Sequence, residues 1–391
     1  MDKKTFILLL VVFIDLIGFG LVIPILPLMI QKIGGGTLLV GGIIALFSFF
    51  QFLFSPILGR LSDKFGRRPI LVLSSFLNSM SYFLIFFSQQ IWIILIARIL
   101  AGIGSANISV AQAYIADTSS SHERTRKLGM IGAVFGLGFI VGPLIGGIIS
   151  SQISIAVAFL VPAVLSLINT VLIYFILPES NKNLQKHIKI EFINIAVTKE
   201  VLRPKNIAFL LLLFFFVNFA LSLIIGVFSL LGQSKFSWNE SQNGYFFGLI
   251  GLSSFLTQGV LIRIMLRWIS EIKMIRLGLV VFAISIVLMG LSPFVWMTII
   301  LGLLVPFSVS LLMINTQSLI SLESKPEEQG IVMGVAQSFA ALGRVFGPLA
   351  GGALAIYSLS LPFVVSGIVT VFILLVGHKY LKFLSDSKVS Y

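Results

Sequence analysis

The sequence alternates between long apolar runs and short polar stretches along its whole length. A transmembrane helix needs about 20 apolar residues to cross the hydrocarbon core of a bilayer. Dividing the apolar runs at glycine, proline and charged residues gives twelve segments of this kind. They are residues 6–30, 38–59, 69–88, 92–116, 128–150, 153–177, 207–231, 242–262, 273–292, 295–320, 330–355 and 359–381. The pattern therefore predicts an all-α integral membrane protein with twelve transmembrane helices.

The two halves of this pattern resemble each other in sequence. GFIVGPLIGG in the fifth segment recurs as GRVFGPLAGG in the eleventh, and the same alignment pairs Asp15 with Asn218 and Gln112 with Gln317. Because each half contains an even number of segments, the two repeats run in the same direction through the membrane. We expect two six-helix repeats related by a pseudo-two-fold axis along the membrane normal, with the substrate path on that axis.

The longest polar segment separates these repeats. It predicts an N-terminal six-helix bundle over residues 1–177, a cytoplasmic central loop over 178–206, and a C-terminal six-helix bundle over 207–391.

Composition supports a membrane protein and argues against several other classes. Hydrophobic residues make up 58% of the chain, charged residues only 10%, and the mean hydropathy is +1.09. A soluble domain cannot bury so much apolar surface. Cysteine is absent, and no phosphate-binding loop, zinc-binding motif or nucleophile constellation occurs. We therefore expect no cofactor, no metal site and no enzymatic activity.

The net charge of +13 reflects where the basic residues lie. With the N-terminus inside the cell, only Lys32 and Lys235 of the 27 lysines and arginines fall in outer loops. This is the positive-inside bias of membrane proteins, so the charge sets topology and does not indicate nucleic-acid binding. We expect a multi-pass protein of the cell membrane with both termini in the cytoplasm. Trp92 and Trp296 fall at predicted outer helix ends, as interfacial anchors do.

Three charged residues, Asp15, Arg98 and Arg344, lie clearly inside predicted spans. Each costs at least about 2.5–3.5 kcal/mol at that depth, so each requires a function or a partner. Asp15 is the sole carboxylate well inside the membrane and is the best candidate to gain and lose a proton. Asp15 and Arg98, which lies nearer the outer face, are the predicted proton-coupling residues. The alternative is a static ion pair between Asp15 and Arg98.

Polar residues also form stripes on two apolar spans. Helical spacing places Arg98, Ser109 and Gln112 on one side of the fourth span, and Gln337 and Arg344 on one side of the eleventh. Such stripes should face a cavity that holds a small-molecule substrate. The predicted cavity residues are Asn107, Ser109, Gln112, Asn218, Asn315, Gln317, Gln337 and Arg344.

Glycines recur every four residues in the repeated segments and form ridges without side chains. Such ridges let neighbouring helices pack at close range, and a proline in each weakens the helical hydrogen-bond ladder. The ridges serve either as plain packing surfaces or as hinges. The residues concerned are Gly138, Gly142, Pro143, Gly146, Gly147, Gly343, Gly347, Pro348 and Gly351.

The most specific motif is GRLSDKFGRR at residues 59–68, directly after the second span. Its two glycines allow a tight turn, Asp63 supplies a carboxylate, and its cations can pair or face anionic lipid. By itself the segment could be a basic loop that only sets topology. It resembles the signature G-x-L-x-D-x-x-G-R-[KR] of the major facilitator superfamily at every position.

The resemblance extends over essentially the whole chain. LIARILAGIG (95–104) is similar to the fourth-helix motif of the superfamily, and GFIVGPLIGG to the fifth-helix motif of its proton-driven drug exporters. YIADTSSSHERTRKLG (114–129) resembles tetracycline/proton antiporters and related multidrug exporters. In the second half the loop motif is weaker, with Leu266 at the counterpart of Asp63.

The resemblance also implies a cytoplasmic gate. Asp117 by itself is an exposed carboxylate at a helix end, but in similar transporters this position joins the loop aspartate and arginine. The trio Asp63, Arg67 and Asp117 would then latch the two halves when the inner side is shut. The implied gate residues are Gly59, Asp63, Gly66, Arg67, Arg68 and Asp117.

Together these features predict a secondary transporter that exports small amphipathic compounds, multidrug or tetracycline-like, in exchange for protons. Its partners would be a small-molecule substrate, protons and the lipid bilayer, and we expect a monomer. Tetracycline exporters carry an aspartate in the third helix where this chain has Ser81. A transporter of a metabolite such as a sugar or an organic anion is the alternative, and a membrane scaffold or receptor is a third possibility.

Overall fold

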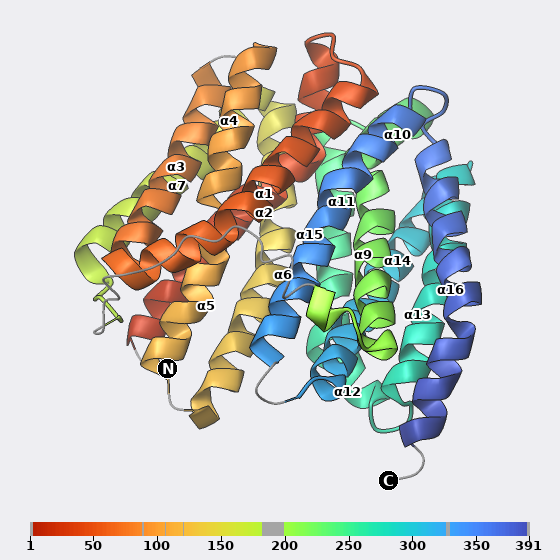
Figure 1. Ribbon diagram of the computed structural model, residues 1–391. Coiled ribbons are helices and arrows are strands. Elements are labelled where there is room, and N and C mark those ends of the chain that lie inside the picture. Colours follow the sequence, from red (N-terminus) through yellow and green to blue (C-terminus); the bar gives the residue numbers. More distant parts are fainter. Residues whose placement is uncertain are drawn as a thin grey trace. The chain divides into compact units, whose positions relative to one another are not determined.

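A computed structural model describes residues 3–87, 90–105, 107–119, 121–181, 199–325 and 329–388. Every regular element in these ranges is a helix (Figure 1). The elements are α1 (Lys3–Lys32), α2 (Thr37–Phe65), α3 (Arg67–Phe87), α4 (Ile91–Gly104), α5 (Asn107–Thr118), α6 (Ser121–Gln152), α7 (Ile155–Ile176), α9 (Lys205–Ile225), α10 (Phe228–Phe236), α11 (Glu240–Leu256), a π-helical turn η1 (Thr257–Leu261), α12 (Ile262–Met265), α13 (Glu271–Leu291), α14 (Val295–Glu323), α15 (Gln329–Leu354) and α16 (Leu361–Lys388).

The prediction of twelve membrane-spanning helices is confirmed. The described residues contain 12 helical segments that are long and apolar enough to cross a bilayer, and each overlaps one predicted segment. Two of the described spans are interrupted: α9 and α10 share the seventh, and η1 interrupts the eighth. Interrupted helices free backbone groups, which membrane proteins tolerate where neighbouring protein or water satisfies them.

The chain forms two compact units. One contains the described residues of Met1–Gly36, Leu46–Phe192 and Ser237–Leu252, and the other those of Thr37–Ala45, Ile193–Phe236 and Ser253–Tyr391. The first unit is thus built mainly from α1 to α7 with most of α11. The second is built mainly from α9, α10 and α12 to α16, with the first turns of α2.

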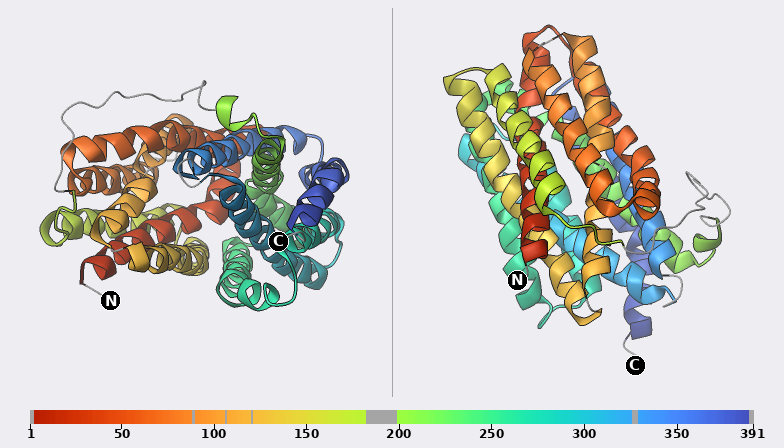
Figure 2. Two further views of the ribbon diagram at one scale, coloured as in Figure 1. Left: turned by 60° about the horizontal axis from the view of Figure 1, so that its bottom comes forward. Right: turned by 90° about the vertical axis from the view of Figure 1, so that its left-hand side faces the viewer.

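Corresponding helices of the two units have corresponding neighbours, as the repeat in the sequence predicts. In the first unit α1 packs against α6 and α7, and α3 packs against α4 and α7 (Figures 1 and 2). In the second unit α9 packs against α15 and α16, and α13 packs against α14 and α16. The first span of each half therefore contacts the fifth and sixth spans of that half, and the third contacts the fourth and sixth. This two-repeat arrangement is typical of the transporter fold.

The glycine ridges lie where the first span of each half meets the fifth. A methyl group added at Gly142 would lie 2.5 Å from the carbonyl oxygen of Ile17, and one added at Gly138 would lie 2.5 Å from the Leu16 side chain. At Gly343 it would lie 2.6 Å from the carbonyl oxygen of Phe215. Only glycine permits these backbones to approach so closely.

The two motifs also contact a second helix. Gly147 packs against Gly244 of α11 within the first unit, and Pro348 packs against Gly41 of α2 within the second. Each proline therefore lies on a helix that is held by glycine contacts on two sides.

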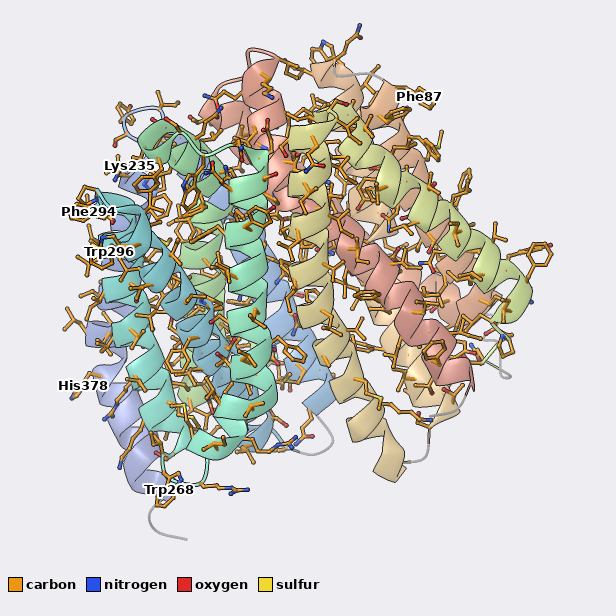
Figure 3. The ribbon with its side chains drawn as sticks, turned by 180° about the vertical axis from the view of Figure 1, so that it is seen from behind. Phe87, Lys235, Trp268, Phe294, Trp296 and His378 are labelled. Atoms are coloured by element: carbon orange, nitrogen blue, oxygen red, sulfur yellow. The ribbon has the colours of Figure 1, made fainter. Side chains whose placement is uncertain are left out.

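Large aromatic side chains are exposed near the ends of several spans. Trp92 follows the first residue of α4 and Trp296 follows the first residue of α14, and both are largely exposed. In the second unit Trp268 lies at one end of the helices, whereas Phe294 and Trp296 lie near the other end (Figure 3). Two such levels at opposite ends are the arrangement of the aromatic belts of membrane proteins.

Candidate transport site and cytoplasmic gate

Asp15 lies in the middle of α1 within a group of amide side chains. Asn107 at the start of α5 donates a hydrogen bond to Asp15 Oδ2, and Asn169 of α7 donates one to Asp15 Oδ1 at 3.4 Å. The same Asn169 nitrogen donates to the carbonyl oxygen of Val11 at 3.0 Å. The carboxylate is partly buried and accepts hydrogen bonds from two other helices, so its position is fixed.

Arg98 is enclosed differently and does not pair with Asp15. It is 3% exposed, and its guanidinium carbon lies 4.3 Å from the centroid of the Phe47 ring, a cation–π contact. Within the described ranges the ion pairs are Lys32 with Glu240 and Arg67 with both Asp63 and Asp117. The static ion pair that the sequence left open is therefore absent, and Asp15 is available for another function.

Tyr82 of α3 is buried against α1, one turn from Asp15. It is 4% exposed, and its hydroxyl oxygen would lie 2.8 Å from a methyl group added at Gly18 of α1. A phenol can donate and accept a hydrogen bond, so Tyr82 adds a polar group to the same region.

Sequence reasoning missed Asn169 and Tyr82. Both lie in apolar segments, and neither is charged. A signal was present for Asn169, because a buried amide in a membrane-spanning helix has to find a partner. Its partner could not be identified from the sequence, since the contact joins residues 154 positions apart.

The other predicted cavity residues differ in their hydrogen-bond partners and in their exposure. Ser109 donates to the carbonyl oxygen of Ser55 at 3.5 Å, and Asn315 donates to the carbonyl oxygen of Leu311, one turn earlier on its own helix, at 2.7 Å. Gln112 and Gln337 are exposed, and Gln317 is partly exposed. Asn218, the counterpart of Asp15, accepts a hydrogen bond from Arg344 at 3.3 Å. The structure thus joins Asn107 to Asp15 and Asn218 to Arg344, while Asn315 is turned toward its own helix.

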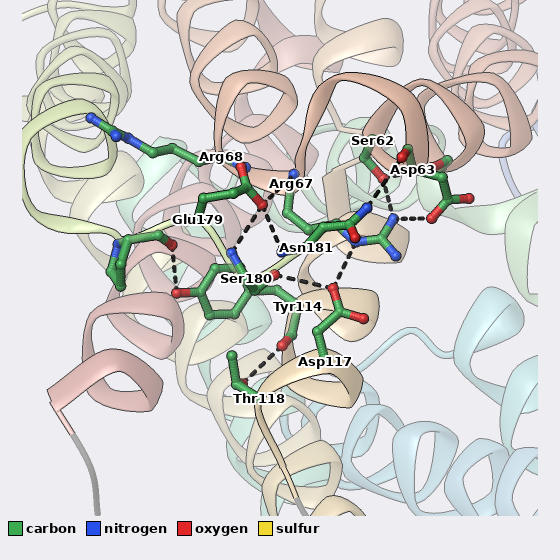
Figure 4. Close-up of polar contacts among 12 residues, drawn as sticks. Ser62, Asp63, Arg67, Arg68, Tyr114, Asp117, Thr118, Glu179, Ser180 and Asn181 are labelled. Atoms are coloured by element: carbon green, nitrogen blue, oxygen red, sulfur yellow. Dashed lines mark hydrogen bonds and ion pairs between the residues drawn. The ribbon is translucent and has the colours of Figure 1, made fainter. Parts of the chain in front are cut away.

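The predicted trio Asp63, Arg67 and Asp117 is in contact. Arg67 Nη1 lies 2.6 Å from Asp63 Oδ1, and Arg67 Nε lies 3.0 Å from Asp117 Oδ2 (Figure 4). Arg67 also donates to Ser62 Oγ at 2.6 Å, and its side chain is largely buried. Arg68 next to it donates to the carbonyl oxygen of Tyr174 and lies over the Tyr174 ring. Arg67 and Arg68 therefore both contact protein groups.

The turn within this motif differs from the sequence expectation. Gly59 lies inside α2, which continues to Phe65, so only Gly66 forms the turn into α3. Gly66 adopts φ +100°, a conformation that favours glycine, and the helices are separated by this single residue. The expected two-glycine loop is therefore wrong. An uninterrupted α2 carries Asp63 on its last turn, four residues before Arg67.

A second group of polar residues, next to the predicted gate, follows α7. Glu179 accepts hydrogen bonds from the backbone N–H groups of Arg67 at 2.9 Å and Arg68 at 3.0 Å, at the first turn of α3 (Figure 4). The partial positive charge of a helix N-terminus favours a carboxylate there. Ser180 Oγ donates to Asp117 Oδ2 at 3.1 Å, and the Asn181 amide donates to the Asp63 carbonyl oxygen at 3.1 Å. The segment after α7 thus contacts each member of the predicted trio.

We expect Glu179→Ala to destabilise the gate, because it removes the carboxylate that caps α3 beside Arg67. The loss of such a cap costs about 1 kcal/mol. The chain has no native cysteine, so a single cysteine introduced at Ser62 reports access without background. Its labelling rate should rise several-fold in Glu179→Ala. In Glu200→Ala, which removes an exposed carboxylate from the same polar region, the rate should not change.

Comparison with known proteins identifies the family. The sequence profile of the Major Facilitator Superfamily matches residues 8–278 and 267–388. The chain is 30% identical to the class E tetracycline resistance protein of Escherichia coli, over 89% of this chain and 87% of that protein. It is also 30% identical to multidrug resistance protein 2 of Bacillus subtilis, over 96% of this chain and 94% of that protein.

Solved structures agree on the fold. The nucleoside transporter NupG superposes with a TM-score of 0.82 at 11% identity, over 96% of this chain and 98% of that chain. The human organic anion transporter MFSD10 superposes with a TM-score of 0.72 at 23% identity, over 96% and 99% of the two chains. The profile covers nearly all of the sequence, and the twelve spans and the neighbour pattern of the helices agree with it. The chain therefore belongs to the major facilitator superfamily of membrane transporters.

Proposed function

We propose that the protein is a secondary transporter that exports small amphipathic compounds in exchange for protons. The relatives named for tetracycline and multidrug resistance support this function over nearly the full length of the chain. The observation that carries it is Asp15, a carboxylate in the middle of a span that is held by amides and is not neutralised by Arg98. A carboxylate in that setting can bind and release a proton, because no ion pair holds it in its deprotonated form.

In this proposal, the gate ion pairs and the glycine contacts between helices break and re-form during transport. Arg67 links the turn between α2 and α3 to α5 through Asp63 and Asp117, so breaking these pairs would release the cytoplasmic ends of three helices. The contact of Gly147 with Gly244 would open or close as transport proceeds. Helices that touch through glycine can separate and meet again without side chains interlocking.

We further infer that the basic gate faces the cytoplasm, that both termini lie on the same side, and that the transporter acts as a monomer in the plasma membrane. The distribution of lysine and arginine supports this orientation. Labelling of single cysteines in whole cells with an impermeant reagent tests it. Reaction at Ser241 and protection at Asp63 are expected, and the opposite result would reverse the topology.

Transport by proteoliposomes tests the function itself. With purified protein and tetracycline or ethidium as cargo, we expect accumulation that depends on an imposed pH gradient and stops when a protonophore dissipates it. A pH-sensitive dye should report proton movement that begins when the cargo is added. Accumulation that continues unchanged after the gradient is dissipated would contradict proton coupling.

A further inference from the structure

The two arginines inside the spans have unlike surroundings. Arg98 is 3% exposed and its charge lies over the ring of Phe47. Arg344 of α15 is partly exposed, and the structure shows no aromatic ring or carboxylate at its guanidinium among the residues that it describes. Of the two, Arg344 is the more exposed.

A single amide holds the guanidinium. Arg344 Nη1 donates to Asn218 Oδ1 at 3.3 Å. The amide nitrogen of Asn218 donates to the carbonyl oxygen of Phe214 at 2.7 Å and contacts the sulfur of Met313 at 3.6 Å. These contacts fix the amide so that its oxygen points to Arg344. A guanidinium has five N–H donors, and the described residues occupy one of them.

Helix packing makes this arrangement rigid. Gly343 and Gly347 bring α15 against the backbone of α9 at Phe215 and Phe219. Arg344 directly follows the first of these glycines, so its position relative to Asn218 is set by two touching backbones. A donor group on rigid helices is held in place before a ligand arrives, which lowers the entropy cost of binding.

Apolar surface lies on the same face of α9. The rings of Phe215 and Phe219 are stacked one turn apart, with centroids separated by 6.0 Å, and both side chains are partly exposed. Asn218 lies between them in the sequence and on the same side of the helix. The face therefore offers a flat apolar surface next to a positively charged donor group.

We propose that Arg344, oriented by Asn218, forms a binding subsite for a negatively charged oxygen group of the substrate, a carboxylate, enolate or phenolate, with the apolar skeleton on Phe215 and Phe219. A guanidinium matches such a group with two parallel N–H donors. The ligand would supply the negative charge that the described residues around Arg344 lack. This subsite rests on the proposed export of amphipathic compounds and defines one chemical feature of the cargo.

Equilibrium binding tests the subsite without proton transport. Purified protein in lipid nanodiscs is titrated with 2-naphthoate and with 2-naphthamide, which share a ring system and differ in charge. We expect the wild type to bind the carboxylate at least tenfold more tightly than the amide. Arg344→Gln should remove this preference, Arg344→Lys should keep part of it, and Arg263→Gln, which removes an exposed charge, should leave it unchanged.

Three results would overturn the subsite. The first is a wild type without preference for the carboxylate, including one that binds neither compound. The second is an Arg344→Gln protein that keeps the preference. The third is that Arg344→Gln weakens the binding of both compounds equally while the melting temperature of the protein stays unchanged. Asp15→Asn separates this inference from the proposed function, because it should abolish proton-driven transport and leave the carboxylate preference intact.

Discussion

Asp15→Asn is expected to abolish proton-driven transport while leaving substrate binding within about a factor of three of the wild type. Asparagine has nearly the same shape and can still bond to Asn107 and Asn169, but it cannot take up or release a proton. The other described carboxylates lie at or near helix ends or outside the helices, so none can replace it at mid-span. Transport driven by a pH gradient in proteoliposomes should fall at least about 100-fold, in the range for loss of an essential proton-transfer group.

The control for this prediction is a variant that loses a carboxylate elsewhere. Glu200→Gln removes an exposed carboxylate near α9 and should transport at the wild-type rate. Exchange of labelled substrate across the membrane without a gradient should persist in Asp15→Asn, because exchange does not require net proton movement. Gradient-driven accumulation by Asp15→Asn at the wild-type level would remove this residue from the coupling mechanism.

Gly142→Ala is expected to cause a large loss of stability although it adds only one methyl group. The added methyl group would lie 2.5 Å from the carbonyl oxygen of Ile17 and 2.9 Å from the backbone nitrogen of Leu21, both on α1. Backbone atoms cannot move away by a change of rotamer as a side chain can, so α1 and α6 must separate. Overpacking of this kind costs on the order of 1–3 kcal/mol. The melting temperature of the purified protein should fall, and the transport rate should fall to about a tenth or less.

The same helix offers a matched control. Gly132→Ala also replaces a helical glycine of α6, but its methyl group would have no atom within 4 Å. That variant should be as stable as the wild type or slightly more stable, since alanine favours the helix by about 1 kcal/mol over glycine. Gly142→Leu should still insert into the membrane and should not transport. If Gly142→Ala melts at the same temperature as Gly132→Ala, close packing of α1 and α6 does not limit stability.

Local sequence determined the spans, the repeat and the helix-packing ridges of this protein. Each depends on residues that are close together in the chain: about 20 apolar residues make a span, and glycines four apart make a ridge on any helix. The trio Asp63, Arg67 and Asp117 was implied only by the resemblance to similar transporters, because Asp117 lies 50 residues after Arg67. The spans, the repeat and the ridges can be predicted from the order of the residues alone.

Tertiary structure alone decided which polar groups meet. In a membrane helix nearly every face is apolar, so the residue pattern is only a weak indication of how each helix is rotated against its neighbours. The rotation decides that Arg98 lies over Phe47 and not beside Asp15. It also decides that Asn169 reaches Asp15, and that Glu179 caps the helix that begins at Arg67. These contacts join residues that are far apart in the chain, and their energy depends on distances that spacing along one helix does not fix.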